Sequence, residues 1–249
     1  MAGKPAKKRL DQVLVERGLV EGLSAAQGLI MAGKVYSGEK KLEKAGLQIS
    51  EEAALEVRGQ DHPWVSRGGL KLTHGLAEFN LSTKDCMCMD VGSSTGGFTD
   101  VMLQNGATRV YAVDVGRGQL AWKLRSDDRV VVLEKTNARH LTSEIIPDPL
   151  DFISCDASFI GLKTLLPASL ELAQPGAYLL SLIKPQFEVA RHEVGEKGVV
   201  RDPKLHKSVC DTIKFWLDGL PDWTVLGLTQ SPIKGPEGNI EFLIAAHKS

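Results

Sequence analysis

Residues 90–99 read Asp-Val-Gly-Ser-Ser-Thr-Gly-Gly-Phe-Thr and lie between two patterned segments. The apolar run 86–89 before them predicts a short buried strand, and residues 98–104 after them predict a helix. A strand, a glycine-rich turn and a helix form the ligand-binding corner of a doubly wound α/β sheet. Glycine lets the backbone approach a ligand where a Cβ would collide. The spacing is neither G-x-G-x-x-G nor that of a P-loop, which excludes the dinucleotide fingerprint and the phosphate-cradling loop.

Two carboxylates accompany this turn. Asp90 stands directly before the first glycine, where an anion suits an ammonium group better than a pyrophosphate. Asp114 ends the next apolar run, where an acid accepts hydrogen bonds from both hydroxyls of a ribose. The combination resembles the S-adenosylmethionine corner of class I methyltransferases. A Rossmann-like corner that binds another nucleotide, or no ligand at all, is the alternative that these residues leave open.

Length and composition indicate a globular protein with two domains. The chain has 249 residues, of which 43% are hydrophobic and 24% charged, with a formal net charge of −1. No stretch approaches the roughly 18 apolar residues of a membrane span, and no apolar segment follows the basic N-terminus as in a secretory signal. The four cysteines form no C-x-x-C pair, so they predict neither a disulfide frame nor a metal site. We therefore expect a cytoplasmic protein with no metal and no membrane partner.

The first sixty residues predict a small α+β unit. Helices are expected over 9–19, with a stop at Gly18, and from an N-cap at Ser24 to Met31. A strand–turn–strand segment at 35–41 and a strand at 54–57 follow. So small a unit has a marginal core and usually serves as a binding module. It resembles the alpha-L RNA-binding domain of the ribosomal protein S-four, on the pattern Arg-Leu-Asp at 9–11, Leu14, residues 24–30, Gly-Lys-Val at 33–35 and Gly38.

That resemblance implies that four cations of this unit face RNA phosphates: Arg9, Lys34, Lys40 and Lys41. Arg67 is assigned to the same RNA-binding set. A solvated surface on an adaptor domain is the alternative. We place the RNA-binding domain at 1–61, a linker at 62–67 and a methyltransferase domain at 68–249, and we expect Trp64 to pack one domain on the other.

Seven further apolar runs predict the strands of one sheet: 86–90, 109–114, 130–134, 150–155, 177–183, 224–228 and 240–246. The runs are continuous rather than alternating, as in strands buried on both faces. Helical connections separate the first six, but only eleven residues join the last two, which makes those two antiparallel neighbours. The predicted fold class is therefore α/β, a Rossmann-like seven-stranded sheet of class I methyltransferase type with an antiparallel last strand, preceded by the small α+β domain.

Four charged residues are expected at one edge of this sheet. Ligands bind beyond the carboxyl ends of the parallel strands, and Asp156 and Lys184 directly follow the fourth and fifth strands. Glu241 lies near the start of the seventh strand, which runs backwards and so begins at the same edge. Lys71, on a predicted helix over 68–79, comes within reach of the same rim.

Five short motifs carry a closer resemblance. FtsJ-type ribose methyltransferases have similar segments: Ser-Arg-Gly-Gly-Leu-Lys-Leu at 66–72, the stretch at 90–100, Asp-Ala-Ser-Phe-Ile at 156–160, Ile-Lys-Pro-Gln-Phe-Glu at 183–188 and Gly-Asn-Ile-Glu-Phe at 238–242. With the N-terminal domain added, the whole chain is similar to the TlyA family of rRNA 2′-O-methyltransferases, which also carries the label haemolysin. The Lys-Asp-Lys-Glu tetrad of that family maps onto Lys71, Asp156, Lys184 and Glu241.

The resemblance implies S-adenosylmethionine as cofactor and ribosomal RNA or a ribosomal subunit as partner. A ribose hydroxyl is a poor nucleophile until its proton is removed, so we assign Lys184 as general base and Asp156 as the residue that orients it. Lys71 and Glu241 would place the nucleotide. The expected cofactor residues lie at the methionine end, at the ribose and at the adenine edge: Asp90, Gly92, Ser94, Gly96, Gly97 and Phe98, then Asp114, then Asn137.

Two other functions are compatible with these motifs. One is an RNA-binding protein whose methyltransferase-like domain is a non-catalytic scaffold. The other takes the haemolysin label literally, as a membrane-lysing protein, although no strongly amphipathic cationic helix is predicted. The polar segment 187–202 is expected to be a mobile loop that closes over RNA, or simply a long surface loop.

Overall fold

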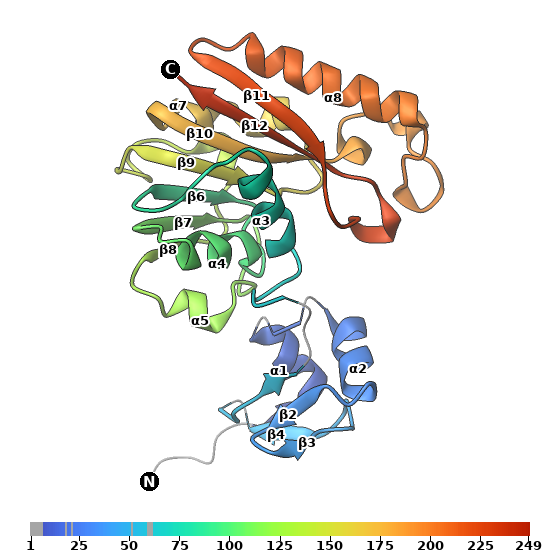
Figure 1. Cartoon of the computed structure of the whole chain (residues 1–249). Coiled ribbons are helices and arrows are strands. Elements are labelled where there is room, and N and C mark those ends of the chain that lie inside the picture. Colours follow the sequence, from blue (N-terminus) through green and yellow to red (C-terminus); the bar gives the residue numbers. More distant parts are fainter. Residues whose placement is uncertain (1–6, 18, 21, 51, 59–61) are drawn as a thin grey trace.

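The computed structural model describes residues 7–17, 19–20, 22–50, 52–58 and 62–249. Figure 1 shows a small N-terminal unit beside a larger α/β body. The expected helix stop at Gly18, and residues 1–6 and 59–61 of the predicted domain boundaries, lie outside the described residues. None of the helices in the described part of the chain has both the length and the apolar character needed to span a bilayer.

The N-terminal unit contains two helices and short strands: β1 (Lys7–Arg9), α1 (Leu10–Glu16), α2 (Leu23–Met31), β2 (Val35–Ser37), β3 (Lys40–Lys41), β4 (Gln48–Ser50) and β5 (Glu56–Val57). The apolar faces of α1 and α2 meet in its core, where Leu10, Leu14 and Ile30 are fully buried. β2 pairs antiparallel with β3, as the predicted strand–turn–strand segment implies, and also with β5. The sequence did not predict the antiparallel pair of β1 and β4.

One N-terminal prediction is wrong. Ser24 does not cap α2, because the helix already begins at Leu23 and its N-cap is Gly22, which has no side chain to donate or accept a hydrogen bond. Ser24 therefore lies inside the first turn, where its backbone is already helical. Glycine is tolerated at an N-cap at a cost of only a few tenths of a kcal/mol relative to serine.

The α/β body is built on a seven-stranded sheet with the order β11-β12-β10-β9-β6-β7-β8. Its strands are β6 (Met87–Val91), β7 (Arg109–Val113), β8 (Val130–Leu133), β9 (Leu150–Cys155), β10 (Ala173–Ile183), β11 (Trp223–Gln230) and β12 (Phe242–Lys248). β12 lies between β10 and β11 and runs antiparallel to both, whereas the pairs among β6 to β10 are parallel. The predicted topology is therefore confirmed.

Helices cover both faces of the sheet and form two apolar cores. On one face lie α3 (Gly69–Glu78), α4 (Gly97–Gln104) and α5 (Trp122–Arg125), and on the other α6 (Leu162–Leu165), α7 (Pro167–Glu171) and α8 (Pro203–Asp218). The sequence pattern of α8 explains its position, because its buried side chains recur every three or four residues. Asp202 caps it, accepting a hydrogen bond from the backbone N–H of Lys204 at 2.8 Å.

One connection differs from the prediction, and a second makes hydrogen bonds to its surroundings. A single 3-10 turn, Ala138–His140, stands between β8 and β9, where a helical connection was expected. The segment 187–202 contains short 3-10 turns and is anchored to its surroundings. The side chain of Asn239, from the β11–β12 connection, accepts from the backbone of Val200 at 3.1 Å and donates to the carbonyl of Gly198 at 3.0 Å. The closure of this segment over RNA stays a prediction.

Candidate active site

The carboxyl edge of the sheet gathers the four charged residues that the sequence singled out. Asp156 directly follows β9, Lys184 follows β10, and Glu241 directly precedes β12. Because β12 is antiparallel to β10, with Phe242 opposite Ile183, its start meets the end of β10. Lys71 comes from the first turn of α3, which packs on one face of the sheet against β10. Residues far apart in the chain therefore converge because of the sheet topology.

Ion pairs join the four side chains into one chain of alternating charge. Lys184 Nζ lies 2.5 Å from Asp156 Oδ1, and Lys71 Nζ lies 3.3 Å from Asp156 Oδ2. Lys71 Nζ also contacts Glu241 Oε2 at 2.8 Å. Glu241 is 1% exposed and both lysines are 7% exposed. Two cations and two anions balance, so a largely dehydrated cluster carries no net formal charge.

Lys71 is held in its charged form. Burial lowers the pKa of its ammonium, but the charges of Asp156 and Glu241 and their hydrogen bonds together outweigh burial, so the pKa is raised. An ammonium held this firmly is a poor proton acceptor. Lys71 therefore suits an anchoring role at the rim of the site.

Lys184 has a further partner that sequence reasoning missed. Its Nζ donates to Ser158 Oγ at 3.1 Å and to the backbone carbonyl of Asp156 at 3.3 Å. Both acceptors belong to the Asp-Ala-Ser turn after β9, so one turn fixes the direction of the lysine side chain. The sequence motif Asp-Ala-Ser-Phe-Ile could have indicated this contact, since Ser158 is its third residue.

Gly235 and Asn239 are also parts of the site that the sequence did not reveal. A Cβ on Gly235 would lie 2.1 Å from Glu241 Oε1, so the Glu241 carboxylate fills the space that a side chain would take. Oε1 is buried and has no hydrogen-bond partner among the described residues. The N–H of Gly235 donates to the carbonyl of Asn239 at 2.9 Å, which closes the turn beneath Glu241.

The glycine-rich turn is shaped by close contacts within the protein. Gly92 has φ +81°, and a Cβ there would lie 2.8 Å from the backbone Cα of Ala157. Gly96, the N-cap of α4, has φ +94°, and its Cβ would collide with Leu124 of α5. Both positions require glycine because an L side chain would be strained as well as blocked. Gly96 thus packs on the side of the turn that faces α5. Unlike Gly92, it does not line either of the two cavities next to the turn.

Asp90 forms the floor of the turn. Its side chain is fully buried and accepts hydrogen bonds from the backbone N–H and the hydroxyl of Thr99, at 2.9 and 2.7 Å, and from the hydroxyl of Ser154 at 3.3 Å. Burial raises the pKa of this carboxyl to about 7, against the effect of those donors. The sequence predicted that Asp90 faces a ligand ammonium, and the observed bonds show that it ties β6 to the start of α4.

Two adjoining cavities open at this edge. The larger has a volume of about 480 Å³, and its polar lining includes Ser94, Asp114 and Asn137. Apolar side chains form its other walls: Val91, Val113, Val115, Ala138, Phe159, Ile160 and Leu165. The smaller, of about 290 Å³, is lined by the lysines and Asp156 of the charged cluster and by Arg67, Asp90, Gly97 and Phe98. Gly92, Ser94, Asp156 and Ser158 line both, so the cavities adjoin.

The larger cavity contains three predicted ligand-binding side chains, Ser94, Asp114 and Asn137. Asp114 accepts from the N–H of Ser94 at 2.8 Å and from the N–H of Gly116 at 2.6 Å, which joins the turns after β6 and β7. Asn137 accepts from the N–H of Arg139 at 3.1 Å and so caps the 3-10 turn after β8. The side chains of Asp114 and Asn137 are thereby fixed at the cavity wall.

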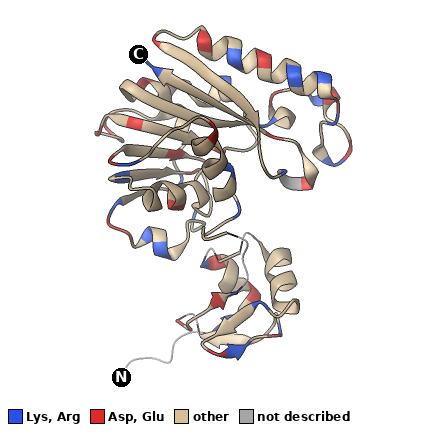
Figure 2. Cartoon of the chain, viewed as in Figure 1, with Lys and Arg blue, Asp and Glu red and all other residues tan. Residues whose placement is uncertain are grey.

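The five predicted RNA-binding cations do not form one cluster. Arg67 is exposed at the smaller cavity. The other four belong to the N-terminal unit, where Lys34, Lys40 and Lys41 are exposed. Arg9 forms a bidentate ion pair with Asp11, with hydrogen bonds of 3.0 and 2.7 Å, and its side chain remains 46% exposed. Figure 2 shows Lys and Arg positions scattered along the ribbon of the unit, with Asp and Glu positions between them.

The sheet order, the antiparallel β12 and the glycine turn at a cavity define a class I methyltransferase fold. Within that class, the chain belongs to the FtsJ-like methyltransferase family, which matches residues 64–248. Residues 8–55 match the S4 domain. The fold and family predicted from the sequence are therefore confirmed.

Relatives cover nearly the whole chain. The protein YqxC of Bacillus subtilis is 50% identical over 97% of this chain and 86% of its own length. The "16S/23S rRNA (cytidine-2'-O)-methyltransferase TlyA" of Mycobacterium tuberculosis is 44% identical over 96% of this chain and 89% of its own. A solved structure described as "Putative hemolysin from Streptococcus thermophilus" superimposes with a TM-score of 0.76 at 43% identity, covering 99% of this chain and 90% of that one.

Proposed function

We propose that this chain transfers a methyl group from S-adenosylmethionine to a ribose 2′-hydroxyl of ribosomal RNA. The observation that carries the proposal is the buried Lys71–Asp156–Lys184 cluster with Glu241, beside a cavity suited to a nucleoside. Membership of the FtsJ-like family and the rRNA methyltransferase named among the relatives support it. Ribosomal RNA lies in the cytoplasm, so the same proposal places the chain there.

The larger cavity fits S-adenosylmethionine in size and chemistry. Its volume of about 480 Å³ is within the range of small-molecule sites, and its apolar walls suit an adenine ring. Asp114 would accept from the ribose hydroxyls and Asn137 would meet the adenine edge. Gly92, Ser94 and Gly97 would surround the methionine end, with Asp90, Gly96 and Phe98 supporting the turn. When bound, this cofactor supplies a methyl group that is already activated by a sulfonium.

The charged cluster would act on the ribose hydroxyl. In its unprotonated form, Lys184 accepts the hydroxyl proton on Nζ, and Asp156 and Ser158 fix the direction of that atom. Lys71 stays protonated between Asp156 and Glu241 and holds the rim in place. A fixed hydroxyl aimed at an activated methyl group gains much of its rate from orientation alone.

Two features support RNA as the substrate. The S4-type unit brings exposed cations, and Arg67 brings another to the smaller cavity. Phe159 is 89% exposed at the cavity border, and its ring centroid lies 5.2 Å from that of Phe187. Exposed aromatic rings beside the reacting groups are suited to stacking on a base. We keep the proposed boundaries at 1–61, 62–67 and 68–249.

The test is methyl transfer from radiolabelled S-adenosylmethionine to ribosomal subunits that lack the modification. We expect transfer by the unchanged chain, and a loss of at least about 100-fold in Lys184→Ala with cofactor affinity retained. Cofactor affinity is measured separately by calorimetry, because a non-catalytic scaffold would show no binding and no transfer. Near-normal turnover by Lys184→Ala would remove this lysine from the mechanism.

A further inference from the structure

Cations line one side of α8, outside the cavities described above. Lys163 of α6 and Lys204 and Lys207 of α8 line a surface hollow of about 490 Å³. Lys207 also lines a second hollow, of about 540 Å³, together with Arg201. Because Lys207 belongs to both, the hollows adjoin. We call the pair of them, with these four cations on their walls, the α8 groove.

The α8 groove reaches the rim of the reaction centre. Ile240 and Phe242, the two neighbours of Glu241 in the chain, line its second hollow. Lys163 lies on α6, the first helix after Asp156, and α8 is the first α-helix after Lys184. In Figure 1 the start of α8 lies at the carboxyl-edge side of the sheet, next to the β11–β12 connection. A polymer bound at the reaction centre would therefore pass close to this groove.

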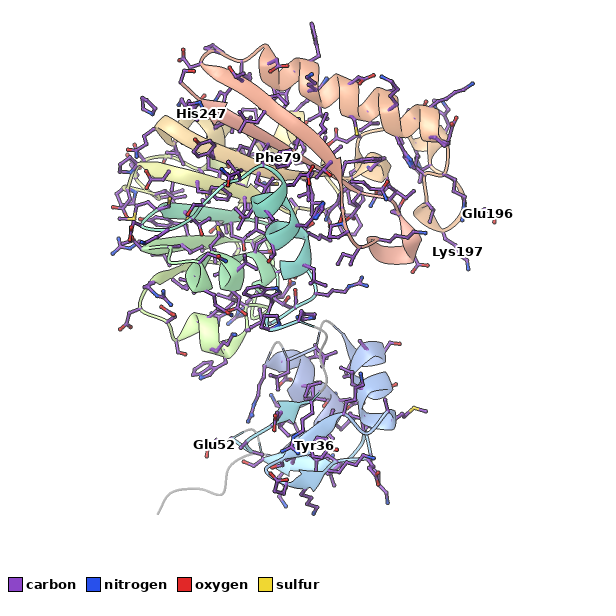
Figure 3. All side chains as sticks on the ribbon, in the orientation of Figure 1. Tyr36, Glu52, Phe79, Glu196, Lys197 and His247 are labelled. Carbon is purple, nitrogen blue, oxygen red and sulfur yellow. The ribbon has the colours of Figure 1, made fainter. Side chains whose placement is uncertain are left out.

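The cations of the groove form few ion pairs within the protein, although the charge of Lys163 acts on the Glu188 carboxyl. Within the described ranges, Lys163, Arg201 and Lys204 have no carboxylate within 4.0 Å and are exposed. Lys207 pairs with Asp211 at 2.5 Å, but the lysine is 77% exposed and such a pair contributes little. Four cations thus face solvent with one acid among the described lining residues. Figure 3 shows Glu196 and Lys197, from the segment before α8, projecting outward next to each other.

An exposed aromatic ring completes the groove. Phe215, on the same face of α8, is 82% exposed and lines the first hollow with the lysines. Positive charges that follow a backbone, with an aromatic ring on which a base can stack, are the usual parts of a surface for single-stranded nucleic acid. An acidic protein would satisfy the cations but would not require the ring.

We propose that the α8 groove binds the phosphate backbone of the RNA substrate next to the nucleotide that is methylated. This inference rests on the proposed function and adds an RNA surface to the catalytic domain. The N-terminal unit lies on the other side, because Arg17, Leu19 and Leu55 share a hollow with Trp122 of α5, which covers the opposite face of the sheet. The RNA is thus held on both sides of the reaction centre.

Charge reversal tests the groove in the full chain. Lys204→Glu and Lys207→Glu are compared, singly and together, with Lys84→Glu, an exposed lysine in the turn before β6 at the opposite edge of the sheet. The probe is extracted 16S and 23S rRNA, with binding measured over a range of salt. We expect the double variant to bind about tenfold more weakly near physiological salt, and each reversal to make the slope of log affinity against log salt shallower by about 0.8. S-adenosylmethionine affinity should not change.

The outcomes are distinguishable. The proposal is overturned if both groove variants bind rRNA with the affinity and salt slope of Lys84→Glu. It is equally overturned if they bind extracted rRNA normally but fail to methylate intact subunits, because the groove would then contact a ribosomal protein. Binding is measured without catalysis, so absence of methyl transfer by the unchanged chain would refute the proposed function and leave the binding result to decide on the groove.

Discussion

Replacing Gly235 by alanine tests whether the position of the Glu241 carboxylate determines kcat. The added Cβ would lie 2.1 Å from Glu241 Oε1 and 2.6 Å from its Cδ. Non-bonded atoms need about 3.5 Å, so the carboxylate must move by more than an ångström. Oε2 then leaves its 2.8 Å contact with Lys71. A displacement of about 1 Å at a reacting site costs about 100-fold in rate, and we expect kcat of Gly235→Ala to fall by that factor.

The assay is methyl transfer to ribosomal subunits at saturating cofactor and RNA, with unfolding and cofactor affinity measured alongside. Gly28→Ala in α2 is the matched control, because a Cβ there meets no atom within 4 Å. Adding Glu241→Asp to Gly235→Ala shortens the acid by one methylene and should restore part of the lost kcat. Normal turnover by Gly235→Ala, or a double variant no more active than Gly235→Ala, would show that the Glu241 position does not control kcat.

Three further predictions concern binding, stability and pH. Asp114→Ala should weaken the binding of S-adenosylmethionine at least about tenfold in calorimetry, since a lost charged hydrogen bond is worth about 1.5–3 kcal/mol. Unchanged affinity would exclude Asp114 as the acceptor of the ribose hydrogen bonds. Lys71→Met should lower the free energy of unfolding by about 3 kcal/mol, because it leaves Glu241 buried and unpaired, and Lys71→Met/Glu241→Gln should recover most of it in denaturant titrations. Equal stability of all three proteins would contradict this. Asp90 has a pKa of about 7 in the folded state, against an ordinary value of 3.8. Between about pH 4 and about pH 7 the folded state therefore binds more protons than the unfolded state, so the free energy of unfolding falls as the pH rises. The free energy of unfolding of Asp90→Asn should therefore rise relative to that of the unchanged chain from about pH 4 to about pH 7, and the difference should stay constant above about pH 7. A difference that does not change with pH would refute the raised pKa of Asp90.

The strands of the sheet were predictable because each is a continuous apolar run between turn signals. β9 was expected and found at residues 150–155. β10 was expected from Ala177 but begins at Ala173, because Pro175 and Gly176 resemble a turn in the sequence. The structure accommodates them in a stretch where the register with β9 shifts. Local residue preference indicated a break there, and pairing with a neighbouring strand overrode it.

The short strands of the N-terminal unit were harder to predict. β1 consists of Lys7, Lys8 and Arg9, which have no apolar alternation. It is a strand because it pairs with β4, about forty residues further on. A pairing of that kind is determined by how α1 and α2 pack, and no local pattern in three charged residues encodes it.

The charged cluster was predictable, and the residues that position it were not. Strand order and family motifs together indicated that Asp156, Lys184 and Glu241 meet at one edge. The contributions of Gly235 and Asn239 depend on where the Glu241 side chain lies, which only the three-dimensional structure specifies. Asp90 shows the same limit, since its position before the glycines fits both a ligand contact and the hydrogen bonds to Thr99 that it makes.

The central claim is that the cluster activates a ribose hydroxyl, and the position of the transferred methyl group tests it most directly. Unmodified ribosomal subunits are incubated with the chain and S-adenosylmethionine, and the RNA is digested to nucleosides for mass spectrometry. We predict a nucleoside with the added methyl on its ribose, present with the unchanged chain and lost with Lys184→Ala. A methyl group on a base, or none on the RNA, would contradict the account.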